Sequence, residues 1–243
     1  MPLRLPRSPH RWNVSPAEAI AVQRELASRI RQTPNAGPFR WIAGVDAAFI
    51  DDGRTCLAAV VLWDRDNRTV VEQHLASDVV RFPYIPGLLS FREVPAVLLA
   101  LRRLSRRPDL LLCDGQGRAH PRCFGLACHL GLVTRWPAVG CAKSRLVGTH
   151  DPPGTEPGSR VPLRVDDELV GQVLRTRSRS RPVFVSVGHG LDLPTAVQVV
   201  WDCLEGHRLP EPTWLADRLV SGRAREIRRA TPEHRRPAEG LPG

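Results

Sequence analysis

Lysine and tyrosine are almost absent from this sequence. Of its 35 basic residues all but one are arginine, the exception being Lys143, and Tyr84 is the only tyrosine. Where every other cation is a planar guanidinium group, a single compact ammonium group marks a position with its own chemical demand. One residue of each type must lie somewhere, so rarity alone assigns no function. Both residues lie in the densest motifs of the chain, and we keep both as candidates.

Cysteine is present, but not in the spacing of a disulfide scaffold or a zinc site. The six cysteines form no C-x-x-C pair, and several lie in apolar runs, where a free cysteine behaves as a small hydrophobic residue. Cys123, Cys128, His120 and His129 are close in sequence, yet their spacing matches no common zinc template. The cysteines therefore indicate reduced thiols in the cytoplasm.

Long apolar runs are missing as well. None approaches the roughly 18 residues that a membrane-spanning helix requires. The first residues, MPLRLPRSPHRW, lack the apolar segment of a signal peptide. We therefore expect a cytoplasmic protein without a membrane partner.

Positive charge is what the sequence has in excess. Lysine and arginine total 35 against 25 acidic residues, which gives a formal net charge of +10. Such a balance favours a polyanionic partner, and nucleic acid is the first candidate. A solvated basic surface that reflects only genome composition would have the same charge, so composition alone leaves both interpretations open.

The 243 residues fit one domain with a core of its own. We expect residues 1–13, which are rich in proline and arginine, to be flexible, residues 14–229 to form the domain, and residues 230–243 to be a disordered tail. The sequence leaves the oligomeric state open, and we expect a monomer.

Hydrophobic periodicity predicts three antiparallel strands first and helix-linked parallel strands afterwards. A capping box at Ser15 and Glu18 opens a first helix to about residue 30. The predicted strands are 41–50, 57–63, 69–80, 109–113, 138–141 and 182–187, with a hairpin at 161–173. The predicted helices after the first are 93–104, 122–132, 193–204 and 213–229. This order indicates an α/β fold with a mixed central sheet flanked by helices, which is the ribonuclease H-like plan.

Two carboxylates lie where apolar strands should be. Asp46 lies in the run IAGVDAAF, and Asp114 follows the apolar strand 109–113, at the end where open α/β sheets place their sites. A buried unpaired carboxylate costs several kcal/mol, so it needs a cation, a hydrogen bond or a proton. Glu93, at the start of the helix after the 82–90 loop, would complete a set of three acids able to bind Mg²⁺, or Mn²⁺ in its place. The alternatives are an exposed strand residue for Asp46 and helix or turn caps for Asp114 and Glu93.

The two rare residues suggest two further roles. Lys143 follows the strand 138–141 and should reach the same end of the sheet, where an ammonium group can neutralise charge on a phosphate. Tyr84 lies in a loop that two prolines stiffen, and such a loop beside a basic cleft can unstack a base pair. A surface lysine and a core tyrosine are the alternatives. His120 and His189 could contact the substrate or make only structural hydrogen bonds.

Taken together, these motifs resemble the endonuclease V family, the enzymes of deoxyinosine repair. The resemblance covers residues 41–220 and rests on AGVD (43–46), PYIPGLLSFRE (83–93), DG (114–115) followed by AHPR (119–122), FGLA (124–127), AKS (142–144) and LPEPT (209–213). Each segment alone is weak, whereas their joint occurrence is specific.

The resemblance implies a Mg²⁺-dependent enzyme that hydrolyses the second phosphodiester bond 3′ to an inosine, leaving 5′-phosphate and 3′-hydroxyl ends. It implies that Asp46, Glu93 and Asp114 bind the metal and that Lys143 supports catalysis. It implies that the Tyr84-Ile85-Pro86-Gly87 loop is a wedge that opens the base pair. It also implies that the pocket for the inosine base lies beside this loop, near Gly87 and Gly115. The implied partner is single- or double-stranded DNA that contains inosine. Inosine-containing RNA as substrate, or a nucleic-acid-binding protein without activity, are the alternatives.

Three positions depart from the family pattern. Members commonly have histidine where Gln116 stands, a basic residue where Cys123 stands, and arginine or lysine where Gly190 stands. None of these changes removes a carboxylate. Because each neutralised phosphate adds to affinity, we expect Gly190→Arg to tighten DNA binding.

Overall fold

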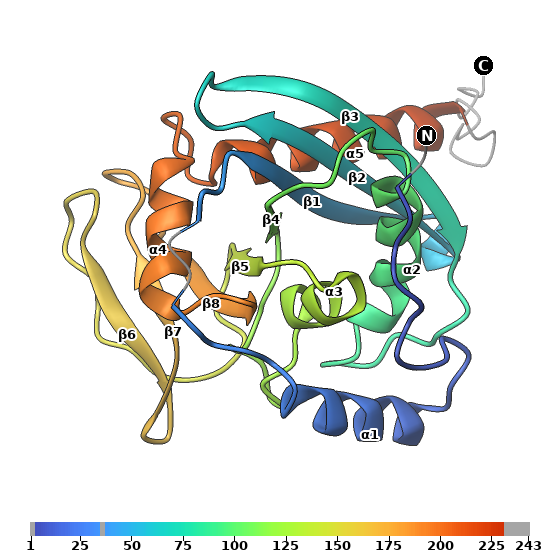
Figure 1. Ribbon diagram of the computed structural model, residues 1–243, viewed down its shortest axis with the longest axis horizontal. Coiled ribbons are helices and arrows are strands. Elements are labelled where there is room, and N and C mark those ends of the chain that lie inside the picture. Colours follow the sequence, from blue (N-terminus) through green and yellow to red (C-terminus); the bar gives the residue numbers. More distant parts are fainter. Residues whose placement is uncertain (1–2, 35–36, 231–243) are drawn as a thin grey trace, which may run out of the picture.

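One eight-stranded sheet organises the chain, as the computed structural model of residues 3–34 and 37–230 shows (Figure 1). Its strand order is β3-β2-β1-β4-β5-β8-β7-β6. The strands are β1 (Trp41–Ile50), β2 (Thr55–Asp64), β3 (Thr69–Val79), β4 (Leu110–Cys113), β5 (Ala138–Ala142), β6 (Arg160–Val165), β7 (Glu168–Leu174) and β8 (Val183–His189). The helices are α1 (Pro16–Ala27), α2 (Ser90–Leu101), α3 (Leu126–Thr134), α4 (Leu193–Asp202) and α5 (Glu211–Ala230).

The sheet is mixed, which confirms the predicted α/β class. The first three strands form an antiparallel meander, and β1, β4 and β5 are parallel neighbours. The strand β8 pairs antiparallel with β5, so the parallel part of the sheet ends there. The predicted hairpin forms β6 and β7, and β7 adds to the sheet beside β8.

Helices cover both faces of this sheet (Figure 1). Alternate residues of β1 point to opposite faces. Ala43 and Val45 pack in the cluster that contains residues of α2 and α3, whereas Ile42 packs in the cluster that contains residues of α4. Helix α5 lies on the same face as α4, against β1 and β2. No helix among the described residues has the length and hydrophobicity needed to cross a bilayer.

The N-terminal segment differs from the sequence prediction. Residues 1–13 were predicted to be flexible, but residues 3–13 pack on the domain. The amide of Leu3 donates to the carbonyl of Arg102 at 2.9 Å, and the ring of Trp12 stacks on His129 with 5.2 Å between centroids. The apolar side chains between the prolines and arginines of this segment cover part of the core under α2. The tail predicted to be disordered is 230–243, and its residues 231–243 lie outside the described residues.

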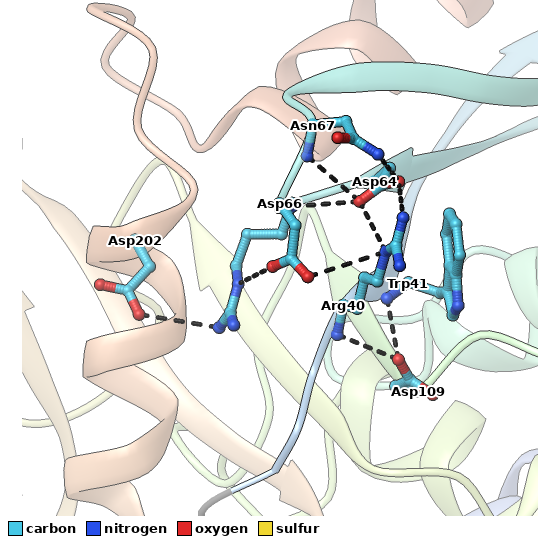
Figure 2. A network of polar contacts seen from close by, with 8 residues as sticks. Arg40, Trp41, Asp64, Asp66, Asn67, Asp109 and Asp202 are labelled. Carbon is cyan, nitrogen blue, oxygen red and sulfur yellow. Dashed lines mark hydrogen bonds and ion pairs between the residues drawn. The ribbon is translucent and has the colours of Figure 1, made fainter.

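A network of charged side chains joins the residues at the start of β1 and β4 to the last residue of β2 (Figure 2). Asp109, just before β4, accepts hydrogen bonds from the backbone N–H groups of Arg40 and Trp41 at 3.0 and 2.8 Å. The guanidinium group of Arg40 binds both carboxylate oxygens of Asp64 at 3.1 and 2.8 Å, and these hydrogen bonds lower the pKa of Asp64. The network therefore ties β1 to β2 and β4, which sets the register that brings Asp46 beside Asp114.

Gly44 allows α5 to begin directly against β1. A Cβ at this position would lie 2.0 Å from the carbonyl oxygen of Pro212. We expect Gly44→Ala to lower the free energy of unfolding by about 2 to 3 kcal/mol because backbone must move to relieve this overlap. Thermal unfolding should show a melting temperature lower by about 4 to 10 °C.

The matched control for this prediction is Gly222→Ala in α5. Nothing lies within 4 Å of a Cβ at Gly222, and alanine favours a helix over glycine by about 1 kcal/mol. This variant should be at least as stable as the wild type. A Gly44→Ala protein with an unchanged melting temperature would contradict the close packing of α5 on β1.

Candidate active site

Three aspartates meet at the carboxyl end of β4. Asp46, Asp114 and Asp217 each offer a carboxylate oxygen, and these oxygens all lie within 4.8 Å of one another. The parallel register pairs Val45 with Cys113, so Asp46 and Asp114 occupy the next positions of neighbouring strands. Strand alternation points Asp46 toward the face that α5 covers. Asp217 comes from α5 itself, and the three acids therefore converge from three elements.

Asp217 is the acid that sequence reasoning missed. The helix 213–229 was predicted, but none of its residues was assigned to the site. The signal was present in the helical spacing, because Asp217 lies four residues after Thr213 and three before Val220, both of which are fully buried. A carboxylate on the buried stripe of an amphipathic helix needs a partner, as Asp46 does in its strand.

Lys143 joins this acidic cluster, defined as Asp46, Asp114 and Asp217. It follows β5, and its Nζ lies 2.5 Å from Oδ2 of Asp114 and 2.8 Å from Oδ1 of Asp217. Partial burial alone would lower the pKa of Lys143, but the charges of the two carboxylates raise it above its ordinary value. The side chain is 42% exposed and still doubly paired, so it is a charged member of the site and not an isolated surface lysine.

The acidic cluster and Glu93 carry more negative charge than Lys143 can neutralise. Burial and the neighbouring Asp114 raise the pKa of Asp46 to about 8. Burial is also the main cause that raises the pKa of Asp114. Although Oδ2 of Asp114 lies close to Lys143, it is buried and accepts no hydrogen bond of ordinary geometry. A hard divalent cation such as Mg²⁺ prefers carboxylate oxygens as ligands, and it would offset the unfavourable negative charge of these buried groups. The residues of the acidic cluster therefore fit such a cation.

Glu93 approaches the acidic cluster from the other face of the sheet. Helix α2 begins at Ser90, three residues before the predicted start, because residues 85–92 already close turn hydrogen bonds. Glu93 is therefore not the helix-opening residue, but it lies in the first turn, where the helix dipole also favours an acid. Its side chain is buried, and burial together with Asp114 raises its pKa to about 8. It stands beside the three aspartates but outside their 4.8 Å group.

A cavity of about 430 Å³ opens beside the acidic cluster. Six residues predicted to bind substrate line it together with Glu93, Asp114 and Lys143; they are Tyr84, Ile85, Pro86, Gly87, Gly115 and His120. The size and the mixture of apolar walls with a few polar groups are typical of a small-ligand site. Tyr84 is 71% exposed at its rim, so it is not part of the core.

The Gly87 carbonyl anchors the wall of this cavity. It accepts hydrogen bonds from Nε2 of Gln23 at 3.0 Å, from Nε2 of His120 at 3.0 Å and from the Arg122 guanidinium group at 2.7 Å. The Arg122 amide donates to Nδ1 of His120, so the proton of His120 must be on Nε2. Burial is the main cause that lowers the pKa of His120 to about 4, and the imidazole is neutral near pH 7. His120 therefore holds the loop in place while it lines the cavity.

His189 does not join the site. It pairs with Ala138 at the start of β5, whereas the acidic cluster lies past the end of that strand. Its Nδ1 accepts a weak hydrogen bond from the Arg31 amide at 3.4 Å. Gly190 follows with a φ of +76°, a conformation that strains an arginine, and its amide donates to the Arg31 carbonyl. The Gly190→Arg substitution would therefore strain the backbone at this position.

The structure also locates the cysteines and Gln116. Among residues 3–34 and 37–230, the acidic cluster is the only group with metal-ligand geometry, so no zinc site forms around Cys123 and Cys128. All six cysteines are free. Gln116 lines the cavity, and its amide donates to the Ser144 carbonyl at 2.8 Å. The departure from histidine at this position thus changes a cavity wall and leaves the carboxylates untouched.

Comparison with known proteins agrees with this geometry. The endonuclease V family model matches residues 24–218. The protein named Endonuclease V from Roseiflexus castenholzii (strain DSM 13941 / HLO8) is 49% identical over 216 residues, which are 89% of this chain and 96% of that protein. The crystal structure of Endonuclease V from Streptomyces avermitilis has a TM-score of 0.85 and 42% identity, over 91% of this chain and 98% of that one.

A more distant likeness concerns the fold alone. The crystal structure of Ciona intestinalis Endonuclease V, in complex with a 24mer DNA containing an inosine followed by a ribo-adenosine, is 23% identical. Its TM-score is 0.75, over 87% of this chain and 98% of that one. The sheet and its helices therefore persist where most side chains have changed.

Proposed function

Because the chain belongs to the endonuclease V family, we propose that it nicks DNA at deoxyinosine, the product of adenine deamination. The proposed reaction is hydrolysis of the second phosphodiester bond 3′ to the inosine, which leaves a 5′-phosphate and a 3′-hydroxyl. The observation that carries the proposal is the acidic cluster with Lys143 beside a cavity of about 430 Å³. The choice of substrate follows from the family, and the Ciona protein, which shares the fold, was crystallised with inosine-containing DNA.

Mg²⁺, with Mn²⁺ as a substitute, is the proposed cofactor. Asp46, Asp114 and Asp217 would hold it, with Glu93 next to them. When bound, it would supply a Lewis acid that activates water and offsets the charge of the scissile phosphate. The raised pKa values of Asp46 and Glu93 describe the chain without this cation, and a nearby cation favours the charged carboxylates.

The side chains around the cation position have separate tasks. Lys143 places a positive charge at the edge of the acidic cluster, where it can stabilise the negative charge that grows on the phosphate. The cavity receives the base that leaves the helix, and Gly87 and Gly115 bring backbone groups to its wall. Tyr84, at the rim of the cavity, fills the space that the base leaves in the duplex. Unstacking the base costs a few kcal/mol, and this cost is smallest for damaged pairs.

We propose that the enzyme acts as a monomer in the cytoplasm, where its free cysteines stay reduced. Inosine-containing RNA is the competing substrate, because the same metal site and cavity could accept it. A protein that only binds nucleic acid is disfavoured, since Asp46, Asp114, Asp217 and Lys143 are present together in one site.

Mapping the nick tests the proposed function. A labelled duplex with one inosine is incubated with Mg²⁺, and the products are resolved next to size markers, in parallel with the matching RNA strand. We expect a nick at the second phosphodiester bond 3′ to the inosine and faster cleavage of DNA. A nick at another bond would contradict the proposed cleavage position. Faster cleavage of RNA would show that inosine-containing RNA is the preferred substrate.

Tyr84→Ala should separate unstacking from chemistry. We expect kcat/KM on duplex DNA to fall by about 10- to 100-fold, because nothing then replaces the extruded base, and a wedge is worth a few kcal/mol. On single-stranded DNA the loss should be several times smaller, since no pair must be opened. Single-turnover rates on both substrates measure this difference, with Tyr84→Phe as the control that keeps the ring. Equal losses on the two substrates would contradict the role of wedge.

A further inference from the structure

A stack of three side chains, His207 from the segment before α5 and Trp214 and Arg218 from α5 itself, takes no part in the proposed chemistry. The rings of His207 and Trp214 are 3.7 Å apart with an angle of 9° between their planes. The guanidinium carbon of Arg218 lies 4.9 Å from the centre of the Trp214 ring. Trp214 is half-buried against the cluster under α4, and Arg218 is exposed. The stack is therefore anchored through Trp214 in its middle and open to a ligand at Arg218.

The stack stands next to the acidic cluster. Trp214 and Arg218 lie three residues before and one residue after Asp217, so all three share one side of α5. Arg208, the neighbour of His207, donates to the carbonyl of Lys143 at 2.5 Å and to that of Pro182 at 2.8 Å. These contacts place the stack at the same end of the sheet as the candidate site.

The acidic cluster separates the stack from the cavity. The cavity is bounded by the loop before α2 and by the first residues of α3, on one face of the sheet. The stack belongs to the face that α4 and α5 cover. A strand that placed a base in the cavity and a phosphate at the aspartates would continue across the stack.

We propose that His207, Trp214 and Arg218 form a second nucleic-acid contact, which holds the nucleotides 3′ of the scissile phosphate by stacking on the Arg218 guanidinium plane. The proposal rests on the proposed function, because that function sets the strand direction: the base lies in the cavity and the bond cut lies 3′ to it.

The chemistry of the stacked side chains favours a nucleic-acid strand as their ligand. Nucleobases stack on aromatic rings and on guanidinium planes without regard to sequence, which suits an enzyme that must act wherever the damage occurs. Arg208 and Arg218 add positive charge for the phosphates. Besides Asp217 of the acidic cluster, Glu211 lies near the stack, and its carboxylate is 3.7 Å from Nε2 of His207, on the side away from Arg218.

The experiment compares two inosine-containing single strands that differ only in their 3′ part. One ends one nucleotide beyond the scissile phosphate, and the other continues for eight. We expect Arg218→Ala to raise KM on the long strand by about 10-fold, as the loss of one stacked base would. KM on the short strand should change by less than about 2-fold, and kcat should be unchanged on both. Equal changes on the two strands, or none, would overturn the proposal.

Matched variants separate stacking from charge and from folding. Arg218→Lys keeps the charge but loses the planar group, and it should behave like Arg218→Ala on the long strand. Arg223→Ala removes the same charge from another side of α5, where Arg223 pairs with Glu226 at 3.1 Å, and should behave like the wild type. Full rescue by lysine would show that charge alone acts and would overturn the stacking. Trp214→Phe should weaken binding of the long strand less than Arg218→Ala.

A separate binding measurement makes the result independent of nicking. Fluorescence anisotropy with the two labelled strands in EDTA measures affinity without turnover. If the wild type fails to nick either strand, the proposed function fails, whereas the affinity difference between long and short strands still decides whether the stack binds nucleic acid. The same affinity of wild type and Arg218→Ala for the long strand would exclude the contact.

Discussion

Asp114→Asn is expected to lower the rate of Mg²⁺-dependent nicking at inosine by at least about 10³-fold, because loss of a metal ligand and of transition-state charge stabilisation costs about 4 kcal/mol. Asparagine keeps the size of the side chain but removes its charge. Asp114 belongs to the acidic cluster and is also paired with Lys143, so one substitution disturbs both the cation position and the ammonium group. Single-turnover kinetics at saturating enzyme measures the effect.

Asp166→Asn is the matched control for that experiment. Asp166 lies in the turn between β6 and β7 with a φ of +49°, a conformation that asparagine adopts readily. It should nick at the wild-type rate. An Asp114→Asn enzyme within about threefold of the wild type would contradict the assignment of the acidic cluster.

Asp46→Asn is expected to make the metal-free protein more stable while it removes the activity. Burial and the Asp114 charge raise the pKa of Asp46 from 3.8 to about 8. A carboxyl with a pKa raised by folding stabilises the fold below its unfolded pKa, and this contribution is lost as the pH rises through the folded value. In EDTA at pH 8 the variant should therefore gain a few kcal/mol, or about 5 to 10 °C in melting temperature.

Thermal unfolding at two pH values tests the sign of this effect. Near pH 4 the melting temperatures of the wild type and the variant should be nearly equal, because Asp46 is then largely protonated in the folded protein. Added Mg²⁺ should raise the melting temperature of the wild type at pH 8 and leave that of Asp46→Asn nearly unchanged. A variant that is less stable than the wild type in EDTA at pH 8 would contradict the account of the acidic cluster.

The fold was predictable where burial leaves a regular pattern. The run 41–50 is apolar on both sides of Asp46, and the strand has these bounds. The pairing of β8 was not predictable, because a short apolar run buried on both faces looks the same in either direction. The start of α2 was missed because the apolar periodicity was read from residue 93, whereas the turn hydrogen bonds of residues 85–92 already lead into the helix at Ser90.

The site was predictable to the extent that its residues lie in strong local patterns. Asp46 and Asp114 are conspicuous because a charge interrupts apolar sequence, and Lys143 because it is alone of its kind. Asp217 was missed because only the contact of α5 with β1, which Gly44 permits, brings it near the other two. His189 was misplaced because sequence places it at a strand end, but strand direction decides which end of the sheet that is.

The most direct test of the central claim uses two DNA duplexes that differ by one base. One carries inosine and the other adenine at the same position, and each is incubated with the wild-type protein in Mg²⁺ and in EDTA. We predict a single nick 3′ to the inosine in Mg²⁺, and none with adenine or in EDTA. Equal cleavage of both duplexes, or cleavage that persists in EDTA, would contradict an inosine-specific endonuclease built on this acidic cluster.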